Sequence, residues 1–180
     1  MCARYVILTE EENREIMRIL REINDKYKDQ SDAVTTGEIF PSNKAPVIIE
    51  EKEKSSSEVF KWGYPGFNNS RCLIPASGFF EWKEEGKRKD KYLIRLKSSN
   101  FFYMAGLCRT FIDNEGKAYS AFVVITTQAN SDMKRIHDRM PVILGEEAAY
   151  SFIKRKESIA SIQKLIVPYS ETLSIEKVVK

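Results

Sequence analysis

Cys2 combines two reactive groups at the start of this 180-residue chain. Removal of Met1 is expected when a residue as small as cysteine follows, and it leaves Cys2 with a free α-amine beside its thiol. Reference pKa values of about 7.7–8.0 for the amine and about 8.5 for the thiol make both groups reactive near neutral pH. Such a 1,2-aminothiol can condense with an aldehyde to an imine and then close to a five-membered thiazolidine ring. An unreactive cysteine at a frayed terminus is the alternative interpretation.

His137 is the only histidine of the chain. Imidazole is the side chain whose unperturbed pKa best suits proton transfer near neutral pH. Asp138 and Arg139 follow it directly, and the segment precedes an apolar stretch, in a region expected to be a loop. Loops often carry functional residues, so His137 is a candidate acid or base. A histidine that only faces solvent is the alternative interpretation.

Glu81 stands in the aromatic run Gly-Phe-Phe-Glu-Trp at 78–82. Strand alternation places Phe80 and Trp82 on one face of the strand, and Phe79 with Glu81 on the other. A carboxylate among apolar neighbours has its pKa raised by burial, which suits acid–base chemistry. An edge strand that leaves Glu81 in water is the alternative interpretation.

The cysteine content excludes several kinds of structural site. The three cysteines, Cys2, Cys72 and Cys108, contain no CxxC pair. Their number and spacing argue against a disulfide framework and against a structural zinc site. Cys72 and Cys108 lie in apolar runs and are expected to be buried, unreactive thiols. The sequence indicates no metal and no organic cofactor.

Charge and hydropathy place the chain among ordinary globular proteins. The net charge of +3 permits contact with phosphates, and the 42% hydrophobic fraction suits a packed core. No apolar run approaches the roughly 20 residues that cross a membrane. The first residues lack the features of a signal peptide. We therefore expect a cytoplasmic protein without membrane contact.

One long helix is predicted near the amino terminus, at 9–28. Thr9 and Glu12 form a T-x-x-E capping box, which predicts that the helix begins there. Apolar residues then recur at helical spacing from Ile16 to Tyr27, as in an amphipathic helix. The polar stretch that follows is expected to end the helix.

Short strands make up most of the remaining chain, separated by turn-forming residues. Strands are predicted at 3–8, 46–52, 57–63, 72–75, 78–83, 91–97, 101–108, 118–127, 140–144 and 173–179. Two short helices are predicted at 146–154 and 158–165. Because no helical pattern separates the central strands, a curved or closed sheet is favoured over a parallel α/β layer. The expected class is α+β: a single domain over 1–180, with a curved, barrel-like, mostly antiparallel sheet and a few flanking helices.

Seven short segments, taken in order, resemble the motifs of the SRAP family (SOS response-associated peptidase). They are Met-Cys-Ala-Arg (1–4), Pro-Ser-Asn-Lys-Ala-Pro (41–46), Trp-Gly (62–63), Arg-Cys-Leu-Ile-Pro-Ala-Ser-Gly-Phe-Phe-Glu-Trp (71–82), Ala-Gly-Leu (105–107), Ile-Thr-Thr-Gln-Ala-Asn (125–130) and Ile-His-Asp-Arg-Met-Pro (136–141). Each segment is weak by itself, but the set runs through most of the chain and is highly specific in this order.

The resemblance implies a DNA-damage protein that crosslinks to abasic sites in single-stranded DNA. Cys2 would be the crosslinking nucleophile, and Glu81 with His137 would be the proton-handling pair. The remaining implied roles are contact with phosphates and the opened sugar for Arg4, Thr126 and Arg139, lining of a cationic groove for Asn43 and Pro46, and base stacking for Phe67. The implied protein is nucleoid-associated and needs no cofactor, and we expect a monomer.

Two departures from the family pattern concern the site. Ala3 replaces the usual glycine, a small change that still allows a tight terminus. The N-A-R-x-E-T segment that family members carry between the Trp-Gly and Arg-Cys-Leu-Ile-Pro motifs has no counterpart, and Asn68 and Asn69 do not match it. Either part of the groove is missing or the printed sequence omits a loop; the retention of Cys2, Glu81 and His137 favours an omitted loop.

Two other functions remain open. One is a cysteine peptidase with Cys2 as an N-terminal nucleophile and His137 as its base, acting on its own leader. The other is a non-covalent module for single-stranded DNA, which would use basic residues and the aromatic cluster at 60–67. Such a module would bind abasic and intact strands equally well.

Overall fold

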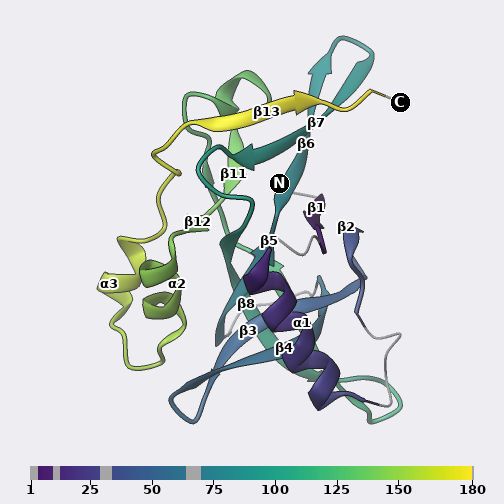
Figure 1. Cartoon of the computed structure of the whole chain (residues 1–180), viewed down its shortest axis with the longest axis vertical. Coiled ribbons are helices and arrows are strands. Elements are labelled where there is room, and N and C mark those ends of the chain that lie inside the picture. The colour runs from purple at the N-terminus through teal and green to yellow at the C-terminus, as the bar shows by residue number, and fades with distance from the viewer. Residues whose placement is uncertain (1–3, 10–12, 29–33, 64–69, 180) are drawn as a thin grey trace.

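A computed structural model describes residues 4–9, 13–28, 34–63 and 70–179. Cys2 and Phe67 therefore lie outside the described residues. The chain is mostly β-structure, arranged as two sheets and a short hairpin, with helices on the outside (Figure 1).

Five strands close into a barrel. Their bounds are β3 (Lys44–Glu51), β4 (Lys54–Trp62), β5 (Ser70–Ala76), β8 (Phe102–Ile112) and β9 (Ala118–Val124). The pairing runs β8-β5-β3-β4-β9 and returns from β9 to β8. All pairs are antiparallel except β4 with β9, which is parallel. A short strand, β12 (Ile143–Leu144), forms an antiparallel pair with the first residues of β8, at Tyr103 and Met104.

A second, open sheet lies beside the barrel and carries the amino-terminal strand. Its order is β13 (Leu173–Lys177), β7 (Arg88–Leu96), β6 (Gly78–Glu85), β1 (Arg4–Ile7) and β2 (Gly37–Ile39). Only Ser77 separates β5 from β6, so the chain passes directly from the barrel into this sheet. The Ser77 backbone N–H donates to the carbonyl of Val6, which ties the crossing point to β1.

A two-stranded hairpin completes the β-structure. It consists of β10 (Thr126–Gln128) and β11 (Arg139–Pro141), and its loop contains the single-turn helix η2 (Met133–Arg135). Val142, directly after the hairpin, donates its N–H to the carbonyl of Ile125 and accepts from the N–H of Ala105. The hairpin is thereby anchored to β8 of the barrel.

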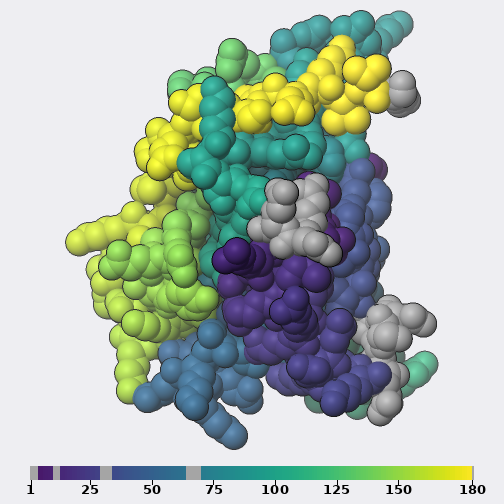
Figure 2. Space-filling view, in the orientation of Figure 1, coloured from purple at the N-terminus to yellow at the C-terminus, as the bar shows by residue number. Residues whose placement is uncertain are grey.

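Helix α1 (Arg14–Lys26) covers one side of the barrel. It buries Ile19 and Ile23 against Ile48 of β3, and its side chains form the surface of this face (Figure 2). Two shorter helices, α2 (Glu146–Ile153) and α3 (Ile159–Gln163), pack beside the barrel at its β5–β8 side (Figure 1).

Aromatic rings fill the barrel interior where it faces the second sheet. Tyr5 of β1 packs against Trp62 with ring centroids 5.1 Å apart, and Trp62 stacks on Phe122 at 6.1 Å. Gly106 of β8 is needed in this core, because a Cβ there would lie 2.6 Å from Ile74 Cδ1 and 2.9 Å from Cys72 Sγ. The core therefore couples β1, which begins near the amino terminus, to the barrel.

The predicted α+β class with a curved, mostly antiparallel sheet is confirmed. The predicted start of the long helix is wrong: α1 begins at Arg14, where the Asn13 side chain accepts the N–H of Ile16, and not at the Thr9 capping box. The strand β2 was not predicted, because three residues are too short for a visible alternation. The strands predicted at 118–127 and 140–144 are each divided in two. Within the described residues, no helix is long and apolar enough to cross a membrane.

Candidate active site

Glu81 lies in the middle of the second sheet, because β6 pairs with β1 on one side and with β7 on the other. Its side chain is only 3% exposed, so the edge-strand alternative is wrong. Oε1 of Glu81 is buried and has no hydrogen-bond partner among the described residues. Burial raises the pKa of Glu81 to about 7 and the negative charge of Asp138 adds to the rise, while a hydrogen bond from the Trp82 backbone opposes it. Glu81 is thus poised to exchange a proton near neutral pH.

His137 lies in the loop between η2 and β11, which backbone hydrogen bonds hold in place. The N–H of His137 donates to the carbonyl of Met133, and the N–H of Ala129 donates to the carbonyl of Asp138. The His137 side chain is 29% exposed, so its ring remains accessible.

The Nδ1 atom of His137 has two neighbours that require different protonation states. It accepts the N–H of Arg139 at 3.0 Å, and it lies 2.9 Å from Oδ1 of Asp138. One nitrogen cannot accept from the amide and donate to the carboxylate at the same time. The neutral ring uses the Nδ1 lone pair for Arg139, which leaves Nε2–H as a donor; the protonated ring pairs with Asp138 instead.

Electrostatic links place the loop of His137 alongside β6. Asp138 raises the pKa of Glu81. Lys89 is the main cause of the lowered pKa of Glu84, further along β6, and His137 adds to that lowering. Asp138 is thus within electrostatic reach of Glu81, and His137 is within electrostatic reach of Glu84 on the same strand.

The β10–β11 hairpin brings Thr126 and Arg139 together. Nη2 of Arg139 donates to the carbonyl oxygen of Thr126 at 2.7 Å and to its Oγ1 at 2.9 Å. Among the described residues, these bonds leave Nε and Nη1 of Arg139 without an acceptor. A guanidinium oriented in this way can present its remaining N–H groups to a carboxylate or phosphate.

Arg4 lies on the opposite face of the second sheet from Glu81, because it pairs directly with Phe80 across β1 and β6. Its guanidinium donates to Glu38 at 2.9 Å and lies 4.5 Å from the ring centroid of Phe40 and 5.1 Å from that of Trp82. Cation–π contacts of this kind hold a planar charge against aromatic rings.

Lys91 of β7 completes this surface. It donates to Glu38 at 2.6 Å and lies 4.0 Å from the ring centroid of Phe80. We call the group made by Arg4, Phe40, Phe80, Trp82 and Lys91 the cationic–aromatic patch. Phe40, Phe80, Trp82 and Lys91 were not predicted as site residues; the alternation that separates Phe80 and Trp82 from Glu81 was the only signal for any of them.

Asn43 shapes the turn that carries Phe40 into this patch. Its Oδ1 accepts the N–H of Phe40 at 2.8 Å, and its own N–H donates to the carbonyl of Phe40 at 3.0 Å. Ser42 adopts a φ of 78° at the third position of the turn, and its N–H donates to the carbonyl of Trp62. Pro46, by contrast, is buried in β3 opposite Val59.

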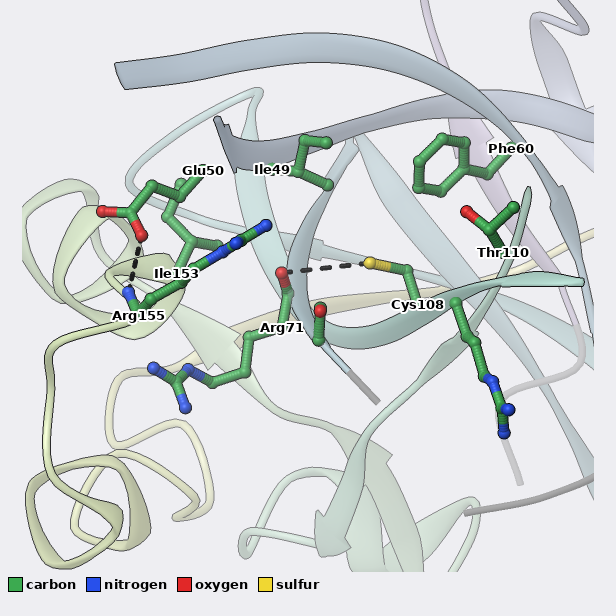
Figure 3. Close-up of a pocket in the computed structure, with 10 residues that line it drawn as sticks. Ile49, Glu50, Phe60, Arg71, Cys108, Thr110, Ile153 and Arg155 are labelled. Carbon is green, nitrogen blue, oxygen red and sulfur yellow. Dashed lines mark hydrogen bonds between the residues drawn. The ribbon is translucent and has the colours of Figure 1, made fainter. Parts of the chain in front are cut away.

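A cavity of about 400 Å³ is lined by residues of β3, β4, β5, β8 and α2, and Glu81 is not among them (Figure 3). Its wall includes Cys108 and Arg155, whose backbone N–H donates to Glu50 at 2.7 Å. Cys72 and Cys108 are both free and buried, as expected. Their thiols differ, because a hydrogen bond from Cys72 lowers the pKa of Cys108, whereas burial raises the pKa of Cys72.

No group of three or more histidine, cysteine, aspartate or glutamate side chains in the described part of the chain could hold a metal ion. The site as described therefore consists of a buried acid, an accessible imidazole and an oriented guanidinium, with a cationic and aromatic surface on the other face of the sheet.

Comparisons with known proteins agree with the motifs. The family model described as SOS response associated peptidase (SRAP) matches residues 65–180. The abasic site processing protein YoqW of Bacillus subtilis is 29% identical over 201 residues, covering 94% of this chain and 88% of the relative. Because that alignment is longer than the chain, the relative contains residues that this chain lacks. The abasic site processing protein YobE of Bacillus subtilis is 34% identical over 157 residues, covering 84% of this chain and 71% of the relative.

Solved structures show the same fold. A crystal structure of a protein from Bacteroides thetaiotaomicron matches with a TM-score of 0.83 and 23% identity, over 98% of this chain and 92% of that one. A second, from Bordetella bronchiseptica, matches with a TM-score of 0.75 and 15% identity, over 99% of this chain and all of that one.

Proposed function

Because the chain belongs to the SOS response associated peptidase (SRAP) family, we propose that it processes abasic sites by bonding Cys2 covalently to the opened sugar in single-stranded DNA. Relatives that align along most of the chain are named abasic site processing proteins. The observation that carries the proposal is the buried carboxyl of Glu81, with a pKa of about 7, on the strand that pairs with β1.

Chain connectivity supports a role for Cys2 at this carboxyl. Arg4, the first described residue, pairs with Phe80, which directly precedes Glu81. Consecutive Cα atoms are about 3.8 Å apart, so two peptide links from Arg4 reach at most about 7 Å. This short connection between Cys2 and Arg4 supports the proposed role of Cys2 at Glu81.

The proposed reaction begins with the abasic sugar in its open form, which has an aldehyde at C1′. The free amine of Cys2 attacks C1′ to give a carbinolamine, and water leaves to give an imine. The thiol then adds to the imine carbon, and the proton from sulfur ends on nitrogen, which closes the thiazolidine. No oxidant or reductant is needed, because the only product besides the linked DNA is water.

Two side chains supply the proton transfers in this scheme. The protonated Glu81 carboxyl donates to the departing hydroxyl, and its carboxylate form accepts a proton from the attacking amine. The protonated ring of His137, whose Nδ1–H faces Asp138, gives its Nε2 proton to the ring oxygen of the sugar as the ring opens, and the C1′ hydroxyl loses its proton to water and becomes the aldehyde. Arg139, oriented by Thr126, binds a neighbouring phosphate or the opened sugar.

A denaturing gel tests the proposal. The protein is incubated with an oligonucleotide that contains one abasic site, and a heat-stable band of protein joined to DNA is expected. Cys2→Ala should abolish the band, whereas the control Cys108→Ala, which removes a thiol in the barrel, should keep it. A Cys2→Ala protein that still crosslinks normally would refute the covalent role of Cys2.

The family description favours a second candidate, a peptidase with Cys2 as nucleophile and His137 as base. A peptidase would cleave a peptide bond and would not need DNA. Mass spectrometry of the purified chain, followed by incubation with unrelated peptides, separates the two functions. Turnover of those peptides by the wild type, lost in Cys2→Ala, would favour the peptidase.

A further inference from the structure

A groove of about 720 Å³ lies outside the site described above, between the end of α1, the open ends of β3 and β4, and the β8–β9 hairpin. Its lining residues are Tyr27, Lys44, Glu58, Val59, Phe60, Lys61, Asp113, Lys117, Ala118, Tyr119 and Ser120. The SRAP motifs include Lys44 only as a variable position, and no role has been assigned to Lys61, Lys117 or Tyr119.

Two lysines of the groove lie side by side on adjacent strands. Lys44 of β3 and Lys61 of β4 are register partners in an antiparallel pair, so their side chains leave the sheet on the same face. Both are exposed, and neither forms an ion pair with any described residue. Like charges directly opposite each other destabilise a sheet, and a bound anion would relieve that repulsion.

The carboxylates of the groove do not neutralise these lysines. Glu58 is bound by Lys26 and Tyr27, both on the side of α1. Asp113 accepts the backbone N–H groups of Glu115 and Lys117 through Oδ1, which fixes the hairpin turn. The groove is therefore lined by three ammonium groups, those of Lys44, Lys61 and Lys117, and by two carboxylates, of which Glu58 is already paired with Lys26.

An aromatic ring lies beside the lysines. Tyr119 of β9 is 39% exposed and stacks on Phe111 of β8, with ring centroids 5.5 Å apart. Exposed aromatic rings next to cationic side chains are the usual surface for a single nucleic-acid strand, since rings stack on bases and cations contact phosphates.

The groove is joined to the cationic–aromatic patch by one tightly bonded turn. Trp62 N–H donates to the carbonyl of Asn43 at 2.8 Å, and Ser42 N–H donates to the carbonyl of Trp62 at 2.8 Å. Asn43 directly precedes Lys44, while Phe40, on the other side of the turn, lies under the guanidinium of Arg4. The turn therefore connects the groove to the patch, which lies on the face of the second sheet opposite Glu81.

We propose that this lysine groove binds the sugar–phosphate backbone of the captured single strand, several nucleotides away from the abasic site. Lys44 and Lys61 contact phosphates, Lys117 closes the hairpin side, and Tyr119 offers its ring to a base. That the bound strand is the one with the abasic site rests on the proposed function. The affinity of the groove for single-stranded DNA rests on its charges and aromatic rings alone.

The test compares the double variant Lys44→Gln/Lys61→Gln with the control Lys97→Gln/Lys164→Gln, which removes the same charge at two exposed lysines outside the groove. Affinity for intact single strands is measured by fluorescence anisotropy at several salt concentrations, with strands of about 5 and about 20 nucleotides, which bracket common site sizes. Crosslink yield is measured in parallel with an abasic site in each strand. The double variant should melt no lower than the wild type, because it removes a repulsion.

For the long strand, the slope of log affinity against log salt should fall by about 1.4 in the double variant, since each phosphate contact with a single strand contributes about 0.7. The control should keep the wild-type slope, and crosslink yield on the short strand should be equal in all three proteins. An unchanged slope for the double variant, or an equal loss in the control, would overturn the groove proposal. Loss of slope in a protein that never crosslinks would support the groove and refute the proposed function instead.

Discussion

Replacement of Glu81 by glutamine should make the protein more stable at high pH and leave it nearly unchanged at low pH. The glutamine keeps the shape of the side chain and cannot ionise. In the wild type, burial raises the pKa of Glu81 from its ordinary value of 4.5 to about 7. The folded protein therefore holds a proton over a pH range in which the unfolded chain has already released it.

The sign and size of the effect follow from that difference. Stability decreases with rising pH wherever the folded state binds more protons than the unfolded state. For Glu81 this range extends from the ordinary pKa of 4.5 to about 7, and above it the loss is constant. At about 1.4 kcal/mol for each pKa unit, ionisation of Glu81 lowers the free energy of unfolding by about 3 kcal/mol, an order-of-magnitude value.

Urea unfolding at several pH values between about 4.5 and about 8.5 measures this effect. The difference in unfolding free energy between Glu81→Gln and the wild type should grow with pH up to about 7 and then stay level. The trend with pH is the test, because the amide does not ionise and its packing contributes the same difference in unfolding free energy at every pH. Glu84→Gln is the matched control: Glu84 is on the same strand but exposed, and its pKa is lowered chiefly by Lys89, so its trend should not rise with pH.

A pH-independent difference between Glu81→Gln and the wild type would refute the reasoning, because Glu81 would then have the same pKa in both states. The same variant should also slow crosslinking, since glutamine can neither donate nor accept the proton. If the variant becomes more stable at high pH but crosslinks at the wild-type rate, then the pKa of Glu81 is raised and Glu81 takes no part in the crosslinking reaction.

Two further substitutions and one labelling experiment test other parts of the structure. Ser42→Gly should raise the free energy of unfolding by roughly 0.5–1 kcal/mol in urea melts, because Ser42 has a φ of 78°; a loss would contradict the turn geometry. Gly106→Ala should lower it by about 1–3 kcal/mol, since the new methyl group would meet Ile74 at 2.6 Å; a neutral result would show that the core adapts. Under native conditions a maleimide should label Cys108 before Cys72, as read by peptide mass spectrometry, because their pKa values move in opposite directions; faster labelling of Cys72 would contradict this.

The local pattern of the sequence was enough to identify most strands and the faces of β6. Alternation in 78–82 places Phe79 with Glu81 and Phe80 with Trp82, and the structure has Phe79 and Glu81 buried and Trp82 against Arg4. Local signals were less reliable at the start of α1. The Thr9 capping box and the Asn13 cap are both acceptable starts, and the structure uses Asn13.

Pairings between distant segments could not be read from the sequence. The closure of the barrel depends on the parallel pair of β4 and β9, and β2 is a strand only because β1 lies beside it. The meeting of Lys44 with Lys61 is of the same kind, since a hairpin register brings them opposite each other. Neither residue type nor spacing signals such contacts.

By itself, the sequence determined the α+β class, the candidate chemistry of Cys2, Glu81 and His137, and the family to which their motifs belong. Only the tertiary structure decided that Glu81 is buried between two partner strands and that its pKa is raised, because solvent exclusion depends on what packs around a side chain. It also decided that Lys44 and Lys61 lie side by side on adjacent strands. Periodicity reports the face on which a residue lies, whereas the neighbours of that face are chosen by the packing of the whole chain.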